Sequence, residues 1–567
     1  MPRSIFYALL SITLLQTALV LNYSAREGRL ALPVYFDDNH SLVDGARRLE
    51  IWYQHGATAL FRDYLANPPH APGHSALAMA AFALFGFHAW APYLTNGVFF
   101  AAILYALLLV LRDNEAWLQI ACLILLASTP IAGISILEFR SEVNVAELGA
   151  LGVALFITWN SGRSSLGRLV ASALCFAACF IIKPPVFPYT LGLMGLCALF
   201  HLRRLLPSAS QRITLQHYLL SMGVFILAAV LPPLPHYLLD WHQITGYIGN
   251  IAFSPSSVWL RHDSLSTSLL FNLTGYPGKI MLGGFLKPCL AVIVAGLIVR
   301  VYRRESWPKS LPLLPMIFFT LGAYLGVAIN LMNQNYFGMT FHWLFLITTL
   351  LALCGTLTVL FPRHVAPCGV LLACIAIILF FGFKFPLSID FYKEKAGGDQ
   401  AIFAWLQQIP ELVMNPIRQE NRDTGATKVW ITAYTMINAR TLEWYSLLHH
   451  EPFLYQDFIE SDWRVVPQRL DWADVVVVPE KGTPSIESII PNAVMADKMV
   501  EQLEHDNRFR LILRLPSPHN GPGFRIYAKK PSFSPFPLST RAFPQIQSLK
   551  IRFLFSPADL ITPHSLT

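Results

Sequence analysis

The chain has 567 residues, of which 54% are hydrophobic and only 13% are charged. Soluble domains usually have about a quarter of their residues charged, so this composition is typical of a membrane protein and excludes an ordinary soluble domain. The formal net charge of +8 does not indicate binding to nucleic acid, because the basic residues form short groups between apolar segments rather than one basic surface.

Apolar segments of roughly the 20 residues needed to cross a bilayer recur along the first two thirds of the chain. We predict eleven membrane spans, at approximately 4–22, 91–111, 116–136, 145–160, 166–183, 186–202, 216–238, 280–300, 311–330, 340–360 and 365–383. Residues 72–86 are also apolar, but about 15 residues suit an interfacial helix better than a span. For the first segment a signal peptide is the alternative, since "MPRS" is basic and "YSA" resembles a cleavage site.

The positive charges between these segments indicate the orientation of the chain. Arginine and lysine gather in the loops on one side, in Arg3, Arg112, Arg168, Arg363 and the stretches "HLRRLLPSASQR" and "RVYRRESWPKS". Cytoplasmic loops carry an excess of positive charge, so we predict a cytoplasmic N-terminus and a long first outer loop at 23–90. The chain from residue 384 onward then lies outside, and the expected location is the inner membrane of a bacterium.

The last third of the chain changes character. "TKVWITAY" and "ADVVVVPE" are typical of buried strands, "TMINARTLEWYSLLHH" of a helix, and "FRLILRLP" with "GFRIYAKK" of a closing strand pair. We therefore predict an α-helical polytopic membrane domain at 1–383 and an extracytoplasmic α/β domain at 384–530. The proline- and serine-rich tail, 531–567, is expected to be loosely ordered.

The first outer loop opens with an acidic pair in the stretch "VYFDDNH", where Asp37 and Asp38 are followed by His40. An acidic pair in an outer loop is usually just solvated. The sequence alone therefore does not give this pair a role.

Later outer loops add further charges near the predicted interface. "EFRSEVNVAE" contains Arg140 and Glu142, and "CFIIKPPVFPYTLGL" contains Lys183. The ordinary explanation for Arg140 is an ion pair with Glu138 or Glu142. For Lys183 it is a helix-end lysine whose amine extends to the interface.

Taken in order, these motifs resemble those of the C-type (GT-C) membrane glycosyltransferases, such as the protein O-mannosyltransferases and the lipid A aminoarabinose transferases. "FDDNH" and "NPPHAPGHSALAMAAFALFG" occupy the places of the family's acidic pair and the apolar segment after it. "EFRSEVNVAE" resembles the family's second outer loop, "CFIIKPPVFPYTLGL" its lysine-containing turn, and "NQNYFGMTFHWLFLITTLLAL" its aromatic-rich turn. The resemblance covers nearly the whole chain and rests on the ordered set of motifs.

The resemblance implies a GT-C-like fold of about 11 membrane helices and a glycosyltransferase activity at the outer face. The donor would be a polyprenyl-phosphate sugar, a hexose or a pentose, and the acceptor a lipid, a glycan or a protein. The site residues implied are catalytic Asp37, Asp38 and Glu142, and substrate-binding His40, Arg140, Lys183 and Tyr336.

Within this set, Asp37 matches the position of the general base, which would take the acceptor's proton opposite the lipid phosphate and so invert the anomeric carbon. Asp38 would orient the loop or the acceptor. Arg140 and Lys183 are the cations for the departing phosphate, because fixed positive groups in a water-poor site stabilise developing negative charge.

Three positions depart from the family pattern. Asp38 stands where glutamate is more usual, Glu142 stands where the second loop has aspartate, and His342 falls near a frequent proline. The dependence on a cofactor stays open: a divalent metal ion held by Asp37 and Glu142 is one alternative, and transfer without metal is the other.

Three competing functions are kept. A membrane transporter of a lipid or solute is expected to place its functional polar residues near the middle of the bilayer. A non-catalytic receptor that senses through the C-terminal domain has no need of the loop carboxylates. Within the family, the alternative is an enzyme of cell-envelope glycan assembly that uses another lipid-linked acceptor.

Overall fold

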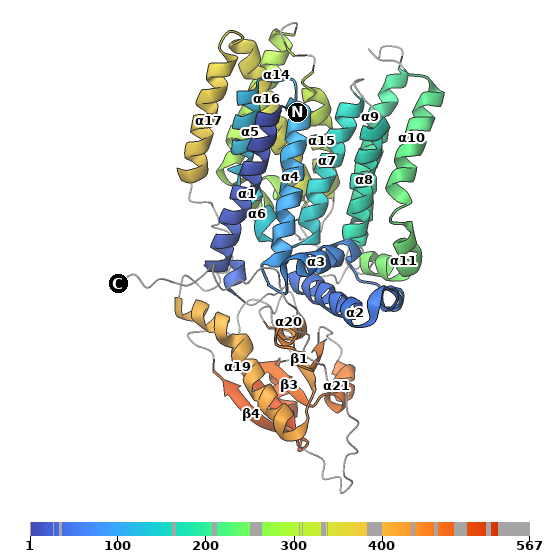
Figure 1. Ribbon diagram of the computed structural model, residues 1–567, viewed down its shortest axis with the longest axis vertical. Helices are drawn as coiled ribbons and strands as arrows, with labels where there is room; N and C mark the ends of the chain where they lie inside the picture. The colour runs from blue at the N-terminus through green and yellow to red at the C-terminus, as the bar shows by residue number, and fades with distance from the viewer. Residues whose placement is uncertain are drawn as a thin grey trace. The chain divides into compact units, whose positions relative to one another are not determined.

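The computed structural model describes residues 2–26, 28–32, 37–160, 166–206, 213–249, 264–304, 307–308, 310–329, 336, 338–382, 400–432, 437–458, 463–480, 496–516 and 523–530. Met1 to Lys529 form one compact unit, which holds a bundle of apolar helices and an α/β domain (Figure 1). The predicted loose tail, 531–567, lies outside the described residues.

The bundle consists of helices that run side by side (Figure 1). They are α1 (Arg3–Arg26), α4 (Ala91–Leu111), α5 (Ala116–Ala127), α6 (Pro130–Leu137), α7 (Ser141–Asn160), α8 (Leu166–Ile182), α9 (Phe187–Leu202), α10 (Leu215–Val230), α12 (Leu265–Thr274), α13 (Tyr276–Leu282), α14 (Leu286–Tyr302), α15 (Leu313–Ile329), α16 (Met339–Leu360) and α17 (Val365–Gly382). Outer helices such as α10 expose large apolar side chains, including Leu219 and Leu220. Apolar surface of this kind is favourable toward lipid.

The eleven predicted spans are all helical, but not all are single straight helices. Among the described residues, six helices are long and apolar enough to cross a membrane, and two bent pairs raise the number to eight. The predicted spans 116–136 and 216–238 are these pairs, α5 with α6 and α10 with α11 (Leu234–Ile248), bent by 63° and 65°. Proline at each break removes a backbone donor and stops the first helix. The other predicted spans are the shorter apolar helices α8, α15 and α17.

Two helices between α1 and α4 lie across one end of the bundle, α2 (Asp37–Ala66) and α3 (Pro72–Phe85) (Figure 1). α3 is the 14-residue segment that was expected not to span. The two helices cross closely at Gly45, where a Cβ atom would come within 2.7 Å of the Ala78 Cβ. A larger side chain at this position would push the helices apart.

α2 changes direction at Gly56, whose φ of 77° is easily adopted only by glycine. Arg48 joins the two halves, because it bonds to Asp44 before the bend at 2.9 Å and to Asp63 after it at 2.8 Å. α2 and α3 therefore form a cap on this end of the bundle.

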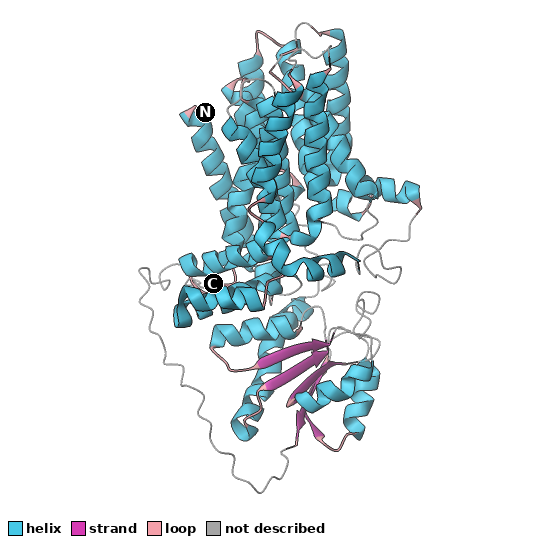
Figure 2. Cartoon of the chain, turned by 90° about the vertical axis from the view of Figure 1, so that its right-hand side faces the viewer, coloured by secondary structure: helices cyan, strands magenta, loops and turns pink. Residues whose placement is uncertain are grey.

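The α/β domain is built on a mixed sheet in the order β2-β1-β3-β5-β4 (Figure 2). Its strands are β1 (Lys428–Thr432), β2 (Leu454–Phe458), β3 (Val475–Pro479), β4 (Phe509–Leu515) and β5 (Phe524–Lys529). β1 pairs in parallel with β2 and β3, whereas β5 is antiparallel to β3 and β4. The helices are α19 (Gln400–Thr424), α20 (Ala439–His449), α21 (Val466–Trp472) and α22 (Ala496–His505).

Both faces of the sheet are covered, which explains the valine run in β3. Val475 and Val477 pack with side chains of α19 and α20, and Val476 and Val478 pack with those of α21 and α22. The predicted strands and the helix at α20 are confirmed. The structure adds β2, whose sequence LYQDF has no β-branched run that would have predicted a strand.

Candidate active site

A buried arginine joins three segments at the end of the bundle where α2 lies. Arg29 stands on the short 3-10 turn η1 (Arg29–Ala31) that follows α1, and only 1% of its surface is exposed. Its Nη2 lies 2.8 Å from Asp38 Oδ1, and its Nη1 pairs with Glu138. Buried charges persist only when they are paired, so this guanidinium fixes the start of α2 relative to the chain after α6.

The first turns of α4 hold the two carboxylate-bearing segments. Tyr93 donates its hydroxyl hydrogen to Asp38 Oδ2 at 2.7 Å. The Asn96 amide donates to the carbonyl oxygens of Ile136 and Glu138 at 3.1 and 3.0 Å. Asp38 and Glu138 are therefore anchored to the same helix as well as to the same arginine.

A buried histidine supports the residue between Glu138 and Arg140. The ring of His74, on α3, stacks on Phe139 with centroids 4.0 Å apart, and its Nε2 lies 3.3 Å from the Phe139 carbonyl oxygen. Burial lowers the pKa of His74 to about 4. The ring is therefore neutral near pH 7, and its Nε2–H donates to the carbonyl.

Arg140 continues the line of charges toward the edge of the cluster. Its Nε donates to Glu138 Oε2 at 3.3 Å, which confirms the ion pair that was the ordinary explanation for this residue. The guanidinium carbon also lies 4.5 Å from the centroid of the Tyr336 ring, a cation–π contact. Its side chain keeps 13% of its surface exposed, so Arg140 reaches the surface of the cluster where Arg29 does not.

A second buried pair lies beside the first. Glu142, in the first turn of α7, pairs with Lys183, which precedes the turn η2 (Pro184–Val186). The Ser141 hydroxyl donates to Glu142 Oε2 at 3.3 Å, and Arg140 also acts electrostatically on this carboxylate. Lys183 is buried and paired, so the explanation as a lysine that extends along lipid to the interface does not hold.

Two predicted site residues, Asp37 and His40, are not among the described side chains of the cluster. Asp37 begins α2, but its side chain lies outside the described part of the chain. His40 is exposed and lines a cleft of about 710 Å³ between α2 and the α/β domain. The structure thus brings five of the predicted site residues into one cluster: Asp38, Arg140, Glu142, Lys183 and Tyr336.

The predicted site residues leave out four members of the cluster, and they are Arg29, Tyr93, Asn96 and Glu138. Glu138 was named only as a possible ion-pair partner of Arg140. For Arg29 a signal existed, because an arginine just after the first span lies on the predicted outer side, against the charge bias of the loops. Tyr93 and Asn96 gave no such signal, since polar residues are common where a span begins.

The metal alternative names Glu142 and Asp37, and the side chain of Asp37 lies outside the described residues. In the part of the chain that the structure describes, no group of three or more histidine, cysteine, aspartate or glutamate side chains is placed to hold a metal ion. The carboxylate of Glu142 is occupied by Lys183. We therefore derive no step through a metal ion.

The burial of Asp38 gives the cluster a pH dependence. Burial raises the pKa of Asp38 from 3.8 to about 7, against the opposing effect of Arg29. The folded protein then binds this proton more tightly than the unfolded chain, so the contribution of Asp38 to stability is complete below about pH 4 and is lost as the pH rises to about 7.

We expect Asp38→Asn to remove this contribution. Thermal unfolding midpoints of the purified protein, measured between pH 4 and 8, should fall less steeply with pH in Asp38→Asn than in the native chain. Asp44→Asn, the same change at a partly exposed aspartate of the same helix, is the comparison. Identical slopes for the native chain and Asp38→Asn would contradict the assignment.

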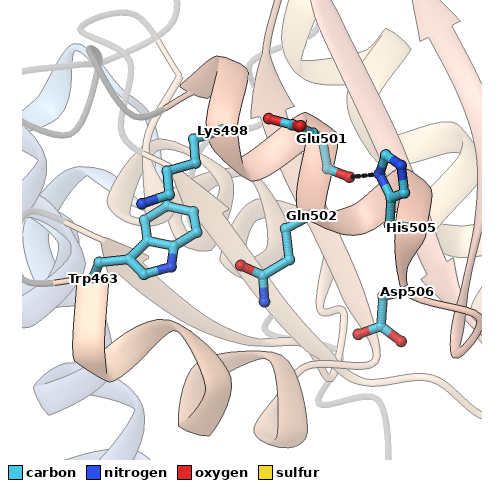
Figure 3. Close-up of a pocket in the computed structure, with 6 residues that line it drawn as sticks. All are labelled: Trp463, Lys498, Glu501, Gln502, His505 and Asp506. Carbon is cyan, nitrogen blue, oxygen red and sulfur yellow. Dashed lines mark hydrogen bonds between the residues drawn. The ribbon is translucent and has the colours of Figure 1, made fainter.

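A second hollow, of about 520 Å³, lies on the α/β domain between α22 and the turn before α21 (Figure 3). The Lys498 amine lies 4.3 Å from the centroid of the Trp463 ring, and the His505 ring bonds to the Glu501 carbonyl at 2.8 Å. The Lys498 and Trp463 side chains therefore contact each other, and none of the residues that line this hollow belongs to the buried cluster.

The helix bundle, the helices α2 and α3 across its end and the following α/β domain together make a polytopic membrane protein with an ArnT-like fold. In particular, the structure is similar to two crystal structures of ArnT from Cupriavidus metallidurans. The apo state has a TM-score of 0.58 at 12% sequence identity and covers 91% of this chain and 97% of ArnT. The state bound to undecaprenyl phosphate has a TM-score of 0.56 at 12% identity, with 93% and 98% covered. No family model matches the sequence, and no curated protein sequence matches it.

Proposed function

We propose that the chain is an integral membrane glycosyltransferase that moves a sugar from a polyprenyl-phosphate donor to a lipid, glycan or protein acceptor at the outer face of the membrane. The observation that carries the proposal is the buried cluster of alternating charges beside the start of α2, in a chain whose fold is similar to that of ArnT. ArnT itself was crystallised with undecaprenyl phosphate, which supports a donor of this chemical class.

The position of the cluster favours this activity over a transporter. Its charged groups stand at the ends of helices or just outside them: Arg29 follows α1, Glu138 follows α6 and Lys183 follows α8. A transporter would place such groups near the middle of the bilayer. In the described part of α7, Glu147 is buried one to two turns deeper and is the exception.

Arg140 and Lys183 are the proposed phosphate ligands. Each is already paired with a carboxylate, so each is held in one place before the substrate arrives. Fixed cations in a water-poor site stabilise a leaving phosphate without reorganising during the reaction. The partly exposed guanidinium of Arg140 is the first cation that a lipid phosphate would meet.

Asp37 is the proposed general base, and Asp38 is the residue that orients the loop or the acceptor. The acceptor hydroxyl oxygen bonds to the anomeric carbon while the bond from that carbon to the phosphate oxygen breaks, with its electron pair staying on the phosphate. The hydroxyl proton passes to Asp37. Attack opposite the phosphate inverts the anomeric carbon. Asp38 is fully buried and bound by Arg29 and Tyr93, which suits positioning rather than proton transfer.

Mass spectrometry of glycolipids and glycoproteins, in matched cells with and without the protein, tests the function. The expected result is the loss of one sugar from one class of acceptor when the protein is absent. Restoring the native chain should restore that sugar, and restoring Asp37→Asn should not. Unchanged glycans in both cell lines would contradict the proposal.

We expect Lys183→Ala and Arg140→Ala to weaken binding of the polyprenyl-phosphate donor by about 10-fold or more, because each removes a charge-assisted contact to phosphate. Isothermal binding of the donor to protein in nanodiscs measures this. Arg48→Ala is the matched control, since Arg48 is a buried arginine of α2 whose described hydrogen bonds go to Asp44, Asp63 and the Asn67 carbonyl. Unchanged donor affinity in both variants would place the phosphate elsewhere.

The outer location of the α/β domain is a separate prediction. α4, α9 and α14 end beside Arg112, Arg203 and Arg303 at the end of the bundle away from α2 (Figure 1). A reporter fused after Lys384 should therefore be active only outside the cytoplasm. A reporter fused after Arg363, in the last predicted inner loop, should be active only inside. Activity of the first fusion in the cytoplasm would put the proposed site on the wrong side of the membrane.

A further inference from the structure

The first turn of α2 is held from two sides, and the second side belongs to the α/β domain. Consecutive residues of a helix point about 100° apart, so Asp38 and Asn39 face different neighbours. Asp38 faces the bundle through Arg29 and Tyr93. Asn39, which is fully buried, faces α20.

Two hydrogen bonds join Asn39 to the N-terminal end of α20. Its Nδ2 donates to the Thr441 hydroxyl oxygen at 2.9 Å and to Asn438 Oδ1 at 3.3 Å. The same Asn438 oxygen caps α20, since it accepts the backbone N–H of Thr441 at 2.9 Å. The N-terminus of α20 is therefore capped and bound to α2 by one shared set of atoms, which fixes the register of the two helices.

Apolar packing continues the contact one turn along α20. Trp444 is buried in one apolar cluster with Leu42 of α2 and Phe82 of α3, and its ring lies 5.4 Å from that of Phe82. Tyr93 and Phe139 belong to the same cluster. These are the residues that bind Asp38 and separate Glu138 from Arg140, so α20 packs on the apolar support of the candidate site.

We infer that α20 of the C-terminal domain is a built-in positioning element of the active site, which sets the place of the acidic pair on α2 through the hydrogen bonds of Asn39 to Thr441 and Asn438. The inference rests on the proposed function, because it concerns the geometry of that site. A displacement of about 1 Å in a catalytic group costs up to about 100-fold in rate, so loosening this contact should lower turnover without removing any group that touches substrate.

The test compares variants of the full chain in nanodiscs. Thr441→Val keeps the shape of the side chain but loses the hydroxyl, and Asn39→Ala loses the donor. Both should lower kcat by about 10-fold or more while the KM for donor stays within about 2-fold. Thr441→Ser keeps the hydroxyl and should restore most of the rate. The double variant should be no slower than the slower single variant, because both remove the same contact.

Asn421→Ala is the structural control. It removes the hydrogen bond from the Asn421 side-chain amide to the Ala426 carbonyl oxygen, which lies within the same domain and away from α2. It should lower the unfolding temperature as Thr441→Val does but leave kcat unchanged. Normal kcat in Thr441→Val and Asn39→Ala, or equal losses in all three variants, would overturn the inference.

Amide hydrogen exchange measures the coupling of α20 to α2 without an activity assay. Thr441→Val, although it lies on α20, should raise amide exchange in residues 38–42 at the start of α2, and Asn421→Ala should not. If the native chain transferred no sugar, the proposed function would fail while this measurement still decided the coupling. Unchanged exchange at 38–42 would overturn the coupling even in an active enzyme.

Discussion

Asp37→Asn is expected to lower turnover by about 100-fold or more while the affinity for the donor stays nearly intact. The amide keeps the size and much of the hydrogen bonding of the carboxylate, but it cannot accept the proton of the acceptor hydroxyl. A loss confined to kcat is the signature of an interaction made chiefly in the transition state. Single-turnover transfer from a radiolabelled polyprenyl-phosphate sugar, with donor binding measured separately, gives both quantities.

Asp38→Asn is the matched comparison, since it is the same change one residue along. Asp38 is fully buried and shares its oxygens with Arg29 and Tyr93, and burial already raises its pKa to about 7. An asparagine resembles the protonated form of this group, so the loss should be smaller than in Asp37→Asn. Equal and severe losses in both variants, with a rate altered by added divalent ion, would instead favour the metal alternative. Near-normal sugar transfer by the Asp37→Asn variant would exclude Asp37 as the general base.

The helices of the bundle were predictable because length and apolarity are local properties of the sequence. α4 occupies residues 91–111 as predicted. The sequence did not show that one apolar segment would break into two helices, as at Pro130. It also did not show that α2 would pack as a helix in the segment between α1 and α4. α2 was not predicted, because its polar positions and the bend at Gly56 hide a helical period that only packing against α3 makes stable.

The candidate site could be predicted from the sequence only in part. The acidic pair, Arg140, Glu142 and Lys183 could be selected because their order resembles a family pattern. Their partners could not, because Arg29 and Glu138 are 109 residues apart and meet only when η1 packs beside the end of α6. The contact of Asn39 with Thr441 spans 402 residues, and no local pattern connects two such positions. Long-range pairing of single polar groups leaves no periodic trace in a sequence.

Removing Arg29 is expected to have the largest effect on stability. Arg29→Met keeps much of the apolar volume of the stem but leaves two buried carboxylates, Asp38 and Glu138, without the cation between them. Breaking a buried pair by removal of one partner typically costs about 3–5 kcal/mol, because the remaining charge stays desolvated. Arg140 lies 3.3 Å from Glu138 and stays as the ion-pair partner of that carboxylate.

Arg48→Met is the control for this effect. Arg48 is also buried, but its partners Asp44 and Asp63 keep 29% and 26% of their side-chain surface exposed, so water solvates them when the arginine is gone. The thermal unfolding midpoint should therefore fall clearly further in Arg29→Met than in Arg48→Met. Adding Asp38→Asn and Glu138→Gln to Arg29→Met removes the uncompensated charges and should raise the midpoint again, whereas transfer activity should stay lost. An Arg29→Met protein as stable as Arg48→Met, or a triple variant less stable than the single one, would show that the cluster is not held together by this arginine.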